Sequence, residues 1–155
     1  MGYRIAGLDD GAFAGMADLD ARGLAAIGAR RMTAEVNGRY PCRVSLDLAQ
    51  PGEELLLINY EHQPEPSSPY RSKGPIFVKV GAERATYDNE LPPPMRGTIL
   101  SLRAYDDKAM IVDAAVAQPE EAESTVERLL ARSDTAYIHA HYAGRGCFAA
   151  RIDRA

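Results

Sequence analysis

Three histidines are the residues whose types and spacing most clearly suggest chemistry. His139 and His141 stand two positions apart in a segment with the pattern of a β-strand, so both side chains leave the same face. A His-x-His pair with a third ligand is typical of zinc and iron sites, because neutral imidazoles bind both metals. His62, in another expected strand, is the third metal ligand in our prediction, and Cys147 and Glu61 are the alternatives.

Cys147 also suggests nucleophilic catalysis. A reactive thiol needs a base, which His139 or His141 would supply, and a nearby cation such as Arg151 would favour the thiolate. The same residues have an ordinary structural interpretation, because a buried cysteine behaves as a small hydrophobic residue and a histidine often only satisfies a hydrogen bond. Both interpretations stay open at the level of the sequence.

The place of Cys147 depends on the hairpin loop that precedes it. A three-residue loop, Gly144–Gly146, pairs His139 with Arg151 and puts Cys147 on the face of the histidines. A loop of two or four residues pairs Tyr142 with Cys147 instead and turns the thiol away. We expect the three-residue loop, because a glycine at its third position readily adopts the left-handed conformation that this turn requires.

A loop between two expected strands is a candidate site for anions. Tyr70, Arg71, Ser72 and Lys73 combine two cations with hydroxyl groups, and Gly74 allows the backbone to approach a ligand. The segment has no phosphate-binding fingerprint, and a solvated surface loop is the alternative interpretation.

Two arginines in expected strands extend the set of anion-binding candidates. Arg103 lies within a mostly apolar strand, so its charge must reach water, a carboxylate or a ligand unless that face is exposed. A two-residue turn at Asp107-Lys108 pairs Arg103 with Val112 and puts Asp113 on the opposite face, which leaves Glu61 or a bound anion as the partner. Arg151, in the last expected strand, is the second of these arginines.

The elements that must position these side chains are mostly strands. Proline and glutamates at the start, arginines at the end and apolar residues at helical spacing predict a helix over 119–132, and a shorter helix is expected over about 18–28. The expected strands cover residues 54–62, 75–80, 98–106, 109–117, 135–142 and 147–152. We therefore expect one α+β domain over residues 1–155, with a mainly antiparallel or mixed sheet.

Composition narrows the class of protein. The 18 basic and 22 acidic residues give a net charge of −4, which argues against a general nucleic-acid binder. No apolar run reaches the roughly 20 residues of a membrane helix, and the first residues lack the pattern of a secretory signal. The expectation is a cytoplasmic protein that binds neither nucleic acid nor membranes.

Five stretches of the chain together resemble a bacterial family of unknown function, DUF1203. The similarity extends over nearly the whole sequence, and these stretches contain the histidines, the arginines and the cysteine discussed above. The family has no established activity, cofactor or partner, so the resemblance implies only that these are its characteristic segments. The stretches are residues 40–46, 60–63, 68–71 with 74–78, 102–106, and 139–141 with 146–151.

Together these observations predict a domain that binds a small anionic molecule in a pocket of histidine, arginine and cysteine side chains. A small enzyme that depends on a metal or on Cys147 is one alternative. An adaptor between proteins is another, although the aromatic content of 7% and the absence of tryptophan make it less favoured.

Overall fold

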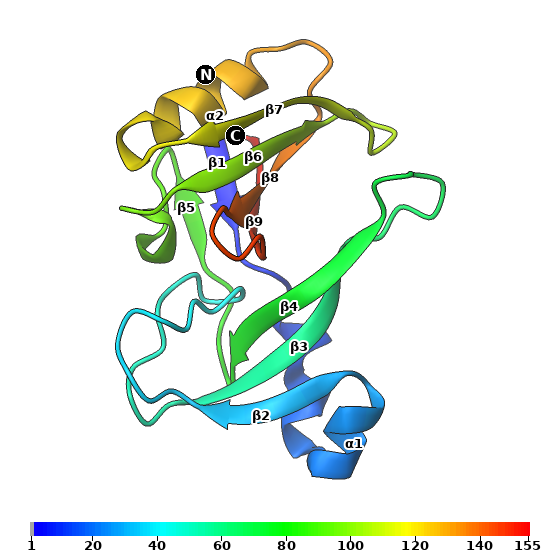
Figure 1. Ribbon diagram of the computed structural model, residues 1–155, viewed down its shortest axis with the longest axis vertical. Helices are drawn as coiled ribbons and strands as arrows, with labels where there is room; N and C mark the ends of the chain where they lie inside the picture. Colours follow the sequence, from blue (N-terminus) through cyan, green and yellow to red (C-terminus); the bar gives the residue numbers. More distant parts are fainter. Residues whose placement is uncertain (1) are drawn as a thin grey trace.

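Two antiparallel β-sheets form the framework of the structure, a computed structural model that describes residues 2–155. The larger sheet has six strands in the order β5-β1-β9-β8-β6-β7, and the smaller sheet has the order β2-β3-β4 (Figure 1). The strands are β1 (Tyr3–Ala6), β2 (Ala29–Thr33), β3 (Glu54–Gln63), β4 (Ser72–Lys79), β5 (Thr86–Asp88), β6 (Leu100–Tyr105), β7 (Ile111–Ala117), β8 (Tyr137–Tyr142) and β9 (Phe148–Arg154).

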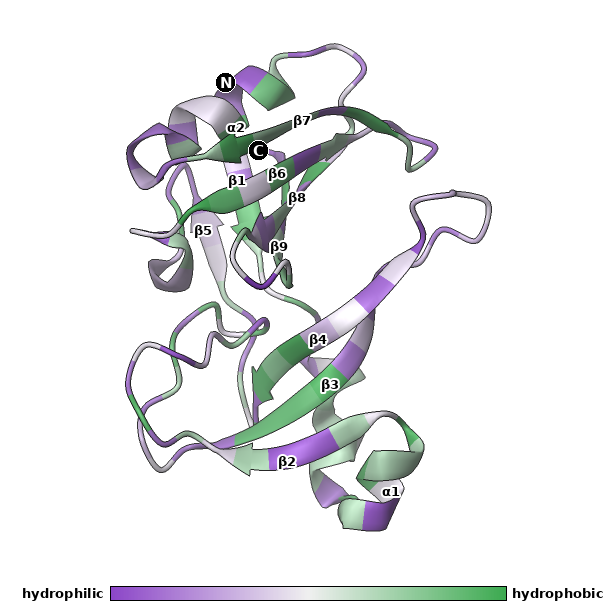
Figure 2. Ribbon diagram, viewed as in Figure 1, coloured by the Kyte–Doolittle hydropathy of each residue, from purple (hydrophilic) through white to green (hydrophobic). Residues whose placement is uncertain are grey.

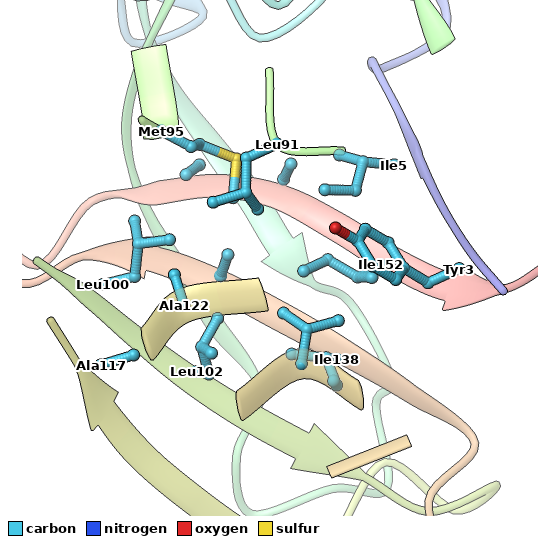
Figure 3. Close-up of a cluster of buried hydrophobic side chains, with 14 of the residues drawn as sticks. Tyr3, Ile5, Leu91, Met95, Leu100, Leu102, Ala117, Ala122, Ile138 and Ile152 are labelled. Atoms are coloured by element: carbon cyan, nitrogen blue, oxygen red, sulfur yellow. The ribbon is translucent and has the colours of Figure 1, made fainter. Parts of the chain in front are cut away.

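Helix α2 (Ala122–Leu130) packs against one face of the six-stranded sheet. Val126 and Leu129 of the helix belong to the same buried cluster as Leu102 of β6 and Ile138 of β8, part of which is shown in Figure 3. Because strand side chains alternate between faces, the alternate residues of β6 and β8 point away from this helix. The sheet therefore presents a second face on which polar side chains can gather.

The smaller sheet has its own apolar cluster, which includes Leu56 and Ile58 of β3, Ile76 and Val78 of β4, and Leu24 of the short helix α1 (Ala21–Ala26). The strands β3 and β4 change from hydrophobic at one end to hydrophilic towards the loop that joins them (Figure 2). This hydrophilic end of the hairpin lies near the six-stranded sheet, because Ser68 of the loop donates a hydrogen bond to the carbonyl oxygen of Ala109 at 2.7 Å.

The prediction of an α+β single domain with two helices is confirmed, and both helices are shorter than expected. The first begins after Asp20, whose side chain caps it by accepting a hydrogen bond from the backbone N–H of Gly23 at 2.7 Å. The second follows a turn of 3₁₀-helix at Pro119–Glu121. Among the described residues, neither helix has the length or the apolar character needed to cross a membrane.

The predicted turn between β6 and β7 is wrong. Arg103 pairs with Ala114, not with Val112, because the loop is longer than expected and because the register shifts again between Ala104 and Tyr105. In the loop, Ala109 takes a positive φ of 58°. Asp113 pairs with Ala104, so it still faces away from Arg103. Its carboxylate lies 3.5 Å from a guanidinium nitrogen of Arg128 on α2.

The predicted register of the β8–β9 hairpin is correct in the strands and wrong at the turn. His139 pairs with Arg151 as expected, but the register shifts before His141, which pairs with Phe148. The backbone of Tyr142 then bonds to that of Cys147, with its N–H donating to the Cys147 carbonyl oxygen at 2.9 Å. A β-bulge thus absorbs one residue and leaves a four-residue loop. Strands β1, β2 and β5 are additional to those expected.

Candidate metal centre

The three histidines come together between the two sheets. His139 and His141 project from β8, and His62 comes from the hydrophilic end of β3. The centroid of the His62 ring lies 4.9 Å from that of His141 and 6.0 Å from that of His139. The three histidines that the sequence analysis grouped as metal ligands, from two separate segments, therefore form one cluster in the structure.

A β-bulge in β3 places His62 in this cluster. The pairing with β4 shifts between Tyr60 and Gln63, so that Glu61 and His62 together stand opposite the single residue Lys73. A bulge bends its strand and changes the direction of a side chain. His62 is consequently buried against the other sheet, whereas its neighbour Glu61 points to the ion pair with Arg71.

The nitrogens of the histidine cluster are close together and buried. One ligand nitrogen from each histidine lies within 4.8 Å of the other two. The Nδ1 atoms of His62 and His139 and the Nε2 atom of His141 are buried, and none has a hydrogen-bond partner among residues 2–155. Because a buried polar atom without a partner costs free energy, three in one cluster call for an explanation.

The hydrogen bond of His141 fixes which of its nitrogens carries the lone pair. Its Nδ1 lies 2.9 Å from the carbonyl oxygen of Gly146, which can only accept, so Nδ1–H donates. In the neutral ring, Nε2 is then an acceptor that faces the other histidines. A carbonyl partner on the far nitrogen is the usual way in which proteins orient a metal-binding imidazole.

Burial keeps the three rings neutral at physiological pH. It lowers the pKa of His139 to about 3 and that of His141 to about 4, and it lowers the pKa of His62 as well. The nearby Arg103 guanidinium acts in the same direction on all three, because a positive charge disfavours a second one. Neutral imidazole is the form that binds metal ions.

Aromatic rings enclose the cluster. Phe148 stacks on His62 with an angle of 3° between the rings, and Tyr105 and Tyr137 lie 4.9 and 5.1 Å from the His139 ring. Sequence reasoning did not assign Tyr137 or Phe148 to the site. The alternation of β8 gives a signal for Tyr137, which shares a face with His139, whereas Phe148 joins only through the bulge.

Arg103 stands next to His139 on the neighbouring strand, β6. Its side chain is partly exposed, and it forms no ion pair with the part of the chain that the structure describes. Of the arginines predicted to bind an anion, it is the one that lies at the histidines with no carboxylate partner.

Cys147 does not join the histidines. It pairs with Tyr142 at the turn, and its side chain lines a different cleft together with Arg43. The prediction that Cys147 shares a face with His139 and His141 is therefore wrong, because the bulge adds the residue that reverses its side. Within residues 2–155, this thiol is not part of the histidine cluster, so the cluster supplies no base for it.

The other predicted anion-binding residues are spread around the site with partners of their own. Arg71 pairs with Glu61, and Arg151 binds Asp153 at 2.8 Å and lies 4.0 Å from the centre of the Tyr137 ring. Ser72 and Lys73 line a shallow surface pocket with the Arg71 pair. Tyr70, which is 40% exposed, lies edge-on to Tyr105 with 6.4 Å between the ring centroids.

Comparison with known proteins gives a family but no activity. No curated protein and no solved structure matches the chain. A family model described as a protein of unknown function, DUF1203, matches residues 39–154, a range that includes all three histidines and Arg103. The chain therefore belongs to the DUF1203 family.

Proposed function

We propose that the protein binds a divalent transition metal ion through His62, His139 and His141 and that Arg103 holds an anion beside that ion. The observation that carries this proposal is the group of three buried imidazole nitrogens that lack partners. A metal ion is a partner that all three lone pairs can share, and it would remove the cost of leaving them unsatisfied.

The donor set favours a transition metal ion such as zinc. Three neutral nitrogens without a thiolate or carboxylate suit zinc, copper, iron or nickel, and they exclude magnesium and calcium, which prefer oxygen. Bonds of about 2.0–2.1 Å to a tetrahedral zinc ion require nitrogens about 3.3 Å apart. The side chains, now within 4.8 Å, therefore have to move closer by about 1.5 Å at most, which side-chain rotation can provide.

The charges around the histidine cluster favour the binding of an anion. A divalent ion bound by three neutral rings keeps its full charge, and Arg103 adds another positive charge next to His139. Glu61, the nearest carboxylate in sequence to His62, is already paired with Arg71. A metal ion among buried rings and a partly exposed guanidinium beside it together favour a counterion, and a guanidinium offers two N–H groups to a carboxylate or a phosphate.

The chemistry that such a centre supports is metal-assisted reaction of a small anion. Three histidine ligands leave a fourth position free on tetrahedral zinc, which is the arrangement of zinc sites that activate water. Arg103 would orient an anionic substrate at that position, and the tyrosines around His139 would exclude bulk water. We therefore favour a metal-dependent enzyme over a domain that only binds an anion.

Titration of zinc onto chelator-treated protein tests the proposal. We expect the wild-type chain to bind one zinc ion and His139→Ala to bind at least about 100-fold more weakly, because it loses one of three ligands. Cys147→Ser is the matched control, since Cys147 lines another cleft. It should bind zinc as the wild type does. Equal binding by the wild type and His139→Ala, or weak binding by Cys147→Ser, would contradict the assignment of the ligands.

The anion part of the proposal has its own variant. Arg103→Gln should still bind one zinc ion, but an anion that coordinates zinc, such as azide, should bind the loaded protein about tenfold more weakly. Arg71→Gln, whose guanidinium is already paired with Glu61, is the control and should leave the azide affinity unchanged. If Arg103→Gln binds azide as tightly as the wild type, Arg103 has no part in anion binding.

A further inference from the structure

A cleft of about 610 Å³ lies away from the histidines. Its walls come from β4, from the segment before β3, from the proline-rich segment before β6 and from the turn between β8 and β9, which converge in Figure 1. Cavities of roughly 300–1,000 Å³ commonly hold small molecules. Its size, and the fact that several segments of the chain line it, make this cleft a candidate binding site distinct from the metal centre.

The charged side chains that line the cleft are all arginines. Among the residues described, no aspartate or glutamate belongs to its lining, although the chain has a net charge of −4. Only one of the arginines forms an ion pair within residues 2–155, Arg96 with Glu90 at 3.0 Å. The arginines are Arg39, Arg43, Arg96 and Arg145.

Arg43 is the most unusual member of this group because it is buried, with 3% of its surface exposed. It donates two hydrogen bonds, from Nε to the carbonyl oxygen of Phe148 at 2.8 Å and from Nη1 to that of Pro41 at 2.7 Å. A guanidinium has five N–H donors, and no carboxylate among residues 2–155 balances the charge of this one. A buried charge without a counterion is costly, so an anion beside Arg43 would offset that cost.

The remaining walls of the cleft indicate which kind of anion would fit it. Ile76 and Phe77 of β4 and the adjoining Pro93 and Pro94 present apolar surface. The Tyr142 ring lies 5.2 Å from the central carbon of the Arg43 guanidinium and contributes a further flat surface. A ligand that uses the whole cleft therefore has an apolar or planar part as well as negative charges.

We propose that this cleft binds a small organic molecule with two or more negative charges and an apolar or planar body, through Arg39, Arg43 and Arg145. Phosphate esters and polycarboxylates share this chemistry, because an arginine fork bonds to either group through two N–H donors. The buried Arg43 acts as the fixed anchor, and the exposed Arg39 and Arg145 close on the charged groups from the rim.

The cleft is separate from the metal centre, but the backbone of residues 146–148 contacts both sites. The carbonyl oxygen of Gly146 accepts the hydrogen bond of His141, while that of Phe148, two residues later, accepts the bond of Arg43. The proposal does not depend on a bound metal, so it can be tested on metal-free protein. Failure of one proposal then leaves the other intact.

Isothermal titration of chelator-treated protein with three probes tests the proposal. The probes are ATP, benzene-1,2,4-tricarboxylate and inorganic phosphate, which represent an organic phosphate, an organic polycarboxylate and a bare anion. We expect ATP or the tricarboxylate to bind at least tenfold more tightly than inorganic phosphate, because only they reach the apolar walls. Which of the two binds more tightly distinguishes phosphate from carboxylate recognition.

Variants of exposed arginines assign the binding to the cleft. Arg39→Gln and Arg145→Gln should each weaken the binding of the better probe about tenfold, through the loss of charge-assisted hydrogen bonds. Arg22→Gln removes an exposed arginine outside the cleft and should have no effect. The proposal is overturned if neither organic probe binds more tightly than phosphate. It is also overturned if Arg22→Gln weakens binding as much as Arg145→Gln does, which would indicate attraction to positive charge in general.

Discussion

Zinc at about one thousand times its dissociation constant is expected to stabilise the folded chain by about 4 kcal/mol, because it binds the folded state and not the unfolded one. For a domain of this size, that corresponds to a rise in Tm of about 8–16 °C. His141→Ala should show no such rise, since it removes the imidazole whose Nε2 lacks a partner. The measurement is thermal unfolding of metal-free protein with and without zinc.

Two controls separate this effect from general binding of zinc. Cys147→Ser should keep the full rise in Tm, because the thiol lies on the opposite face of the hairpin from the histidines and lines another cleft. Addition of a chelator should return the wild-type chain to its starting Tm. A rise of the same size in His141→Ala would show that zinc binds elsewhere on the protein.

The metal-free protein is expected to lose stability steeply as the pH falls below about 6.5. The folded pKa values of His139 and His141, about 3 and about 4, lie below the ordinary value of 6.5. Between these limits the unfolded chain binds more protons than the folded one, so the free energy of unfolding decreases as the pH falls. Each histidine contributes a loss of about 2 kcal/mol between pH 7.5 and pH 5.

Urea unfolding at these two pH values measures the loss, and His139→Gln is the comparison. This variant has no titrating group at that position, so its stability should fall by about 2 kcal/mol less than that of the wild type. The pH-dependent contributions of exposed carboxylates are common to both proteins and cancel in the difference. An identical fall in the two proteins would mean that His139 is not held neutral by burial.

The sequence predicts the histidine cluster because strand periodicity is a local property. The two-residue spacing of His139 and His141 places them on one face whatever the rest of the fold does. That His62 completes the group depends on the approach of the two sheets and on the bulge at Glu61 and His62. Sequence reasoning included His62 only as a residue of suitable chemistry, since neither event has a local signal.

The turns are where prediction from the sequence fails. In both hairpins of the larger sheet, a register shift changes the pairing, between Ala104 and Tyr105 in β6 and between Ala140 and His141 in β8. The loop before β7, with Ala109 at a positive φ, is also longer than expected. A bulge changes the side on which a residue lies, and its position depends on packing against other strands. For this reason Cys147 does not lie beside the histidines as expected. The contact of Phe148 with the histidines could not be predicted for the same reason.

The arginine cleft could not be predicted from the sequence either. Arg39, Arg43, Arg96 and Arg145 are spread over more than one hundred residues, and three separate loops bring them together. Each of them alone resembles an ordinary surface arginine. Their significance comes from the burial of Arg43 and from the lack of acidic residues in the lining, which only the folded chain reveals.

X-ray absorption spectroscopy of the zinc-loaded protein is the most direct test of the central claim, that three histidines form a metal centre. The account predicts three imidazole nitrogens at about 2.0–2.1 Å and no sulfur neighbour. A sulfur atom at about 2.3 Å would assign Cys147 or Cys42 to the metal and contradict the ligand set. A shell of water oxygens without imidazole scattering would show that the zinc is bound only at the surface.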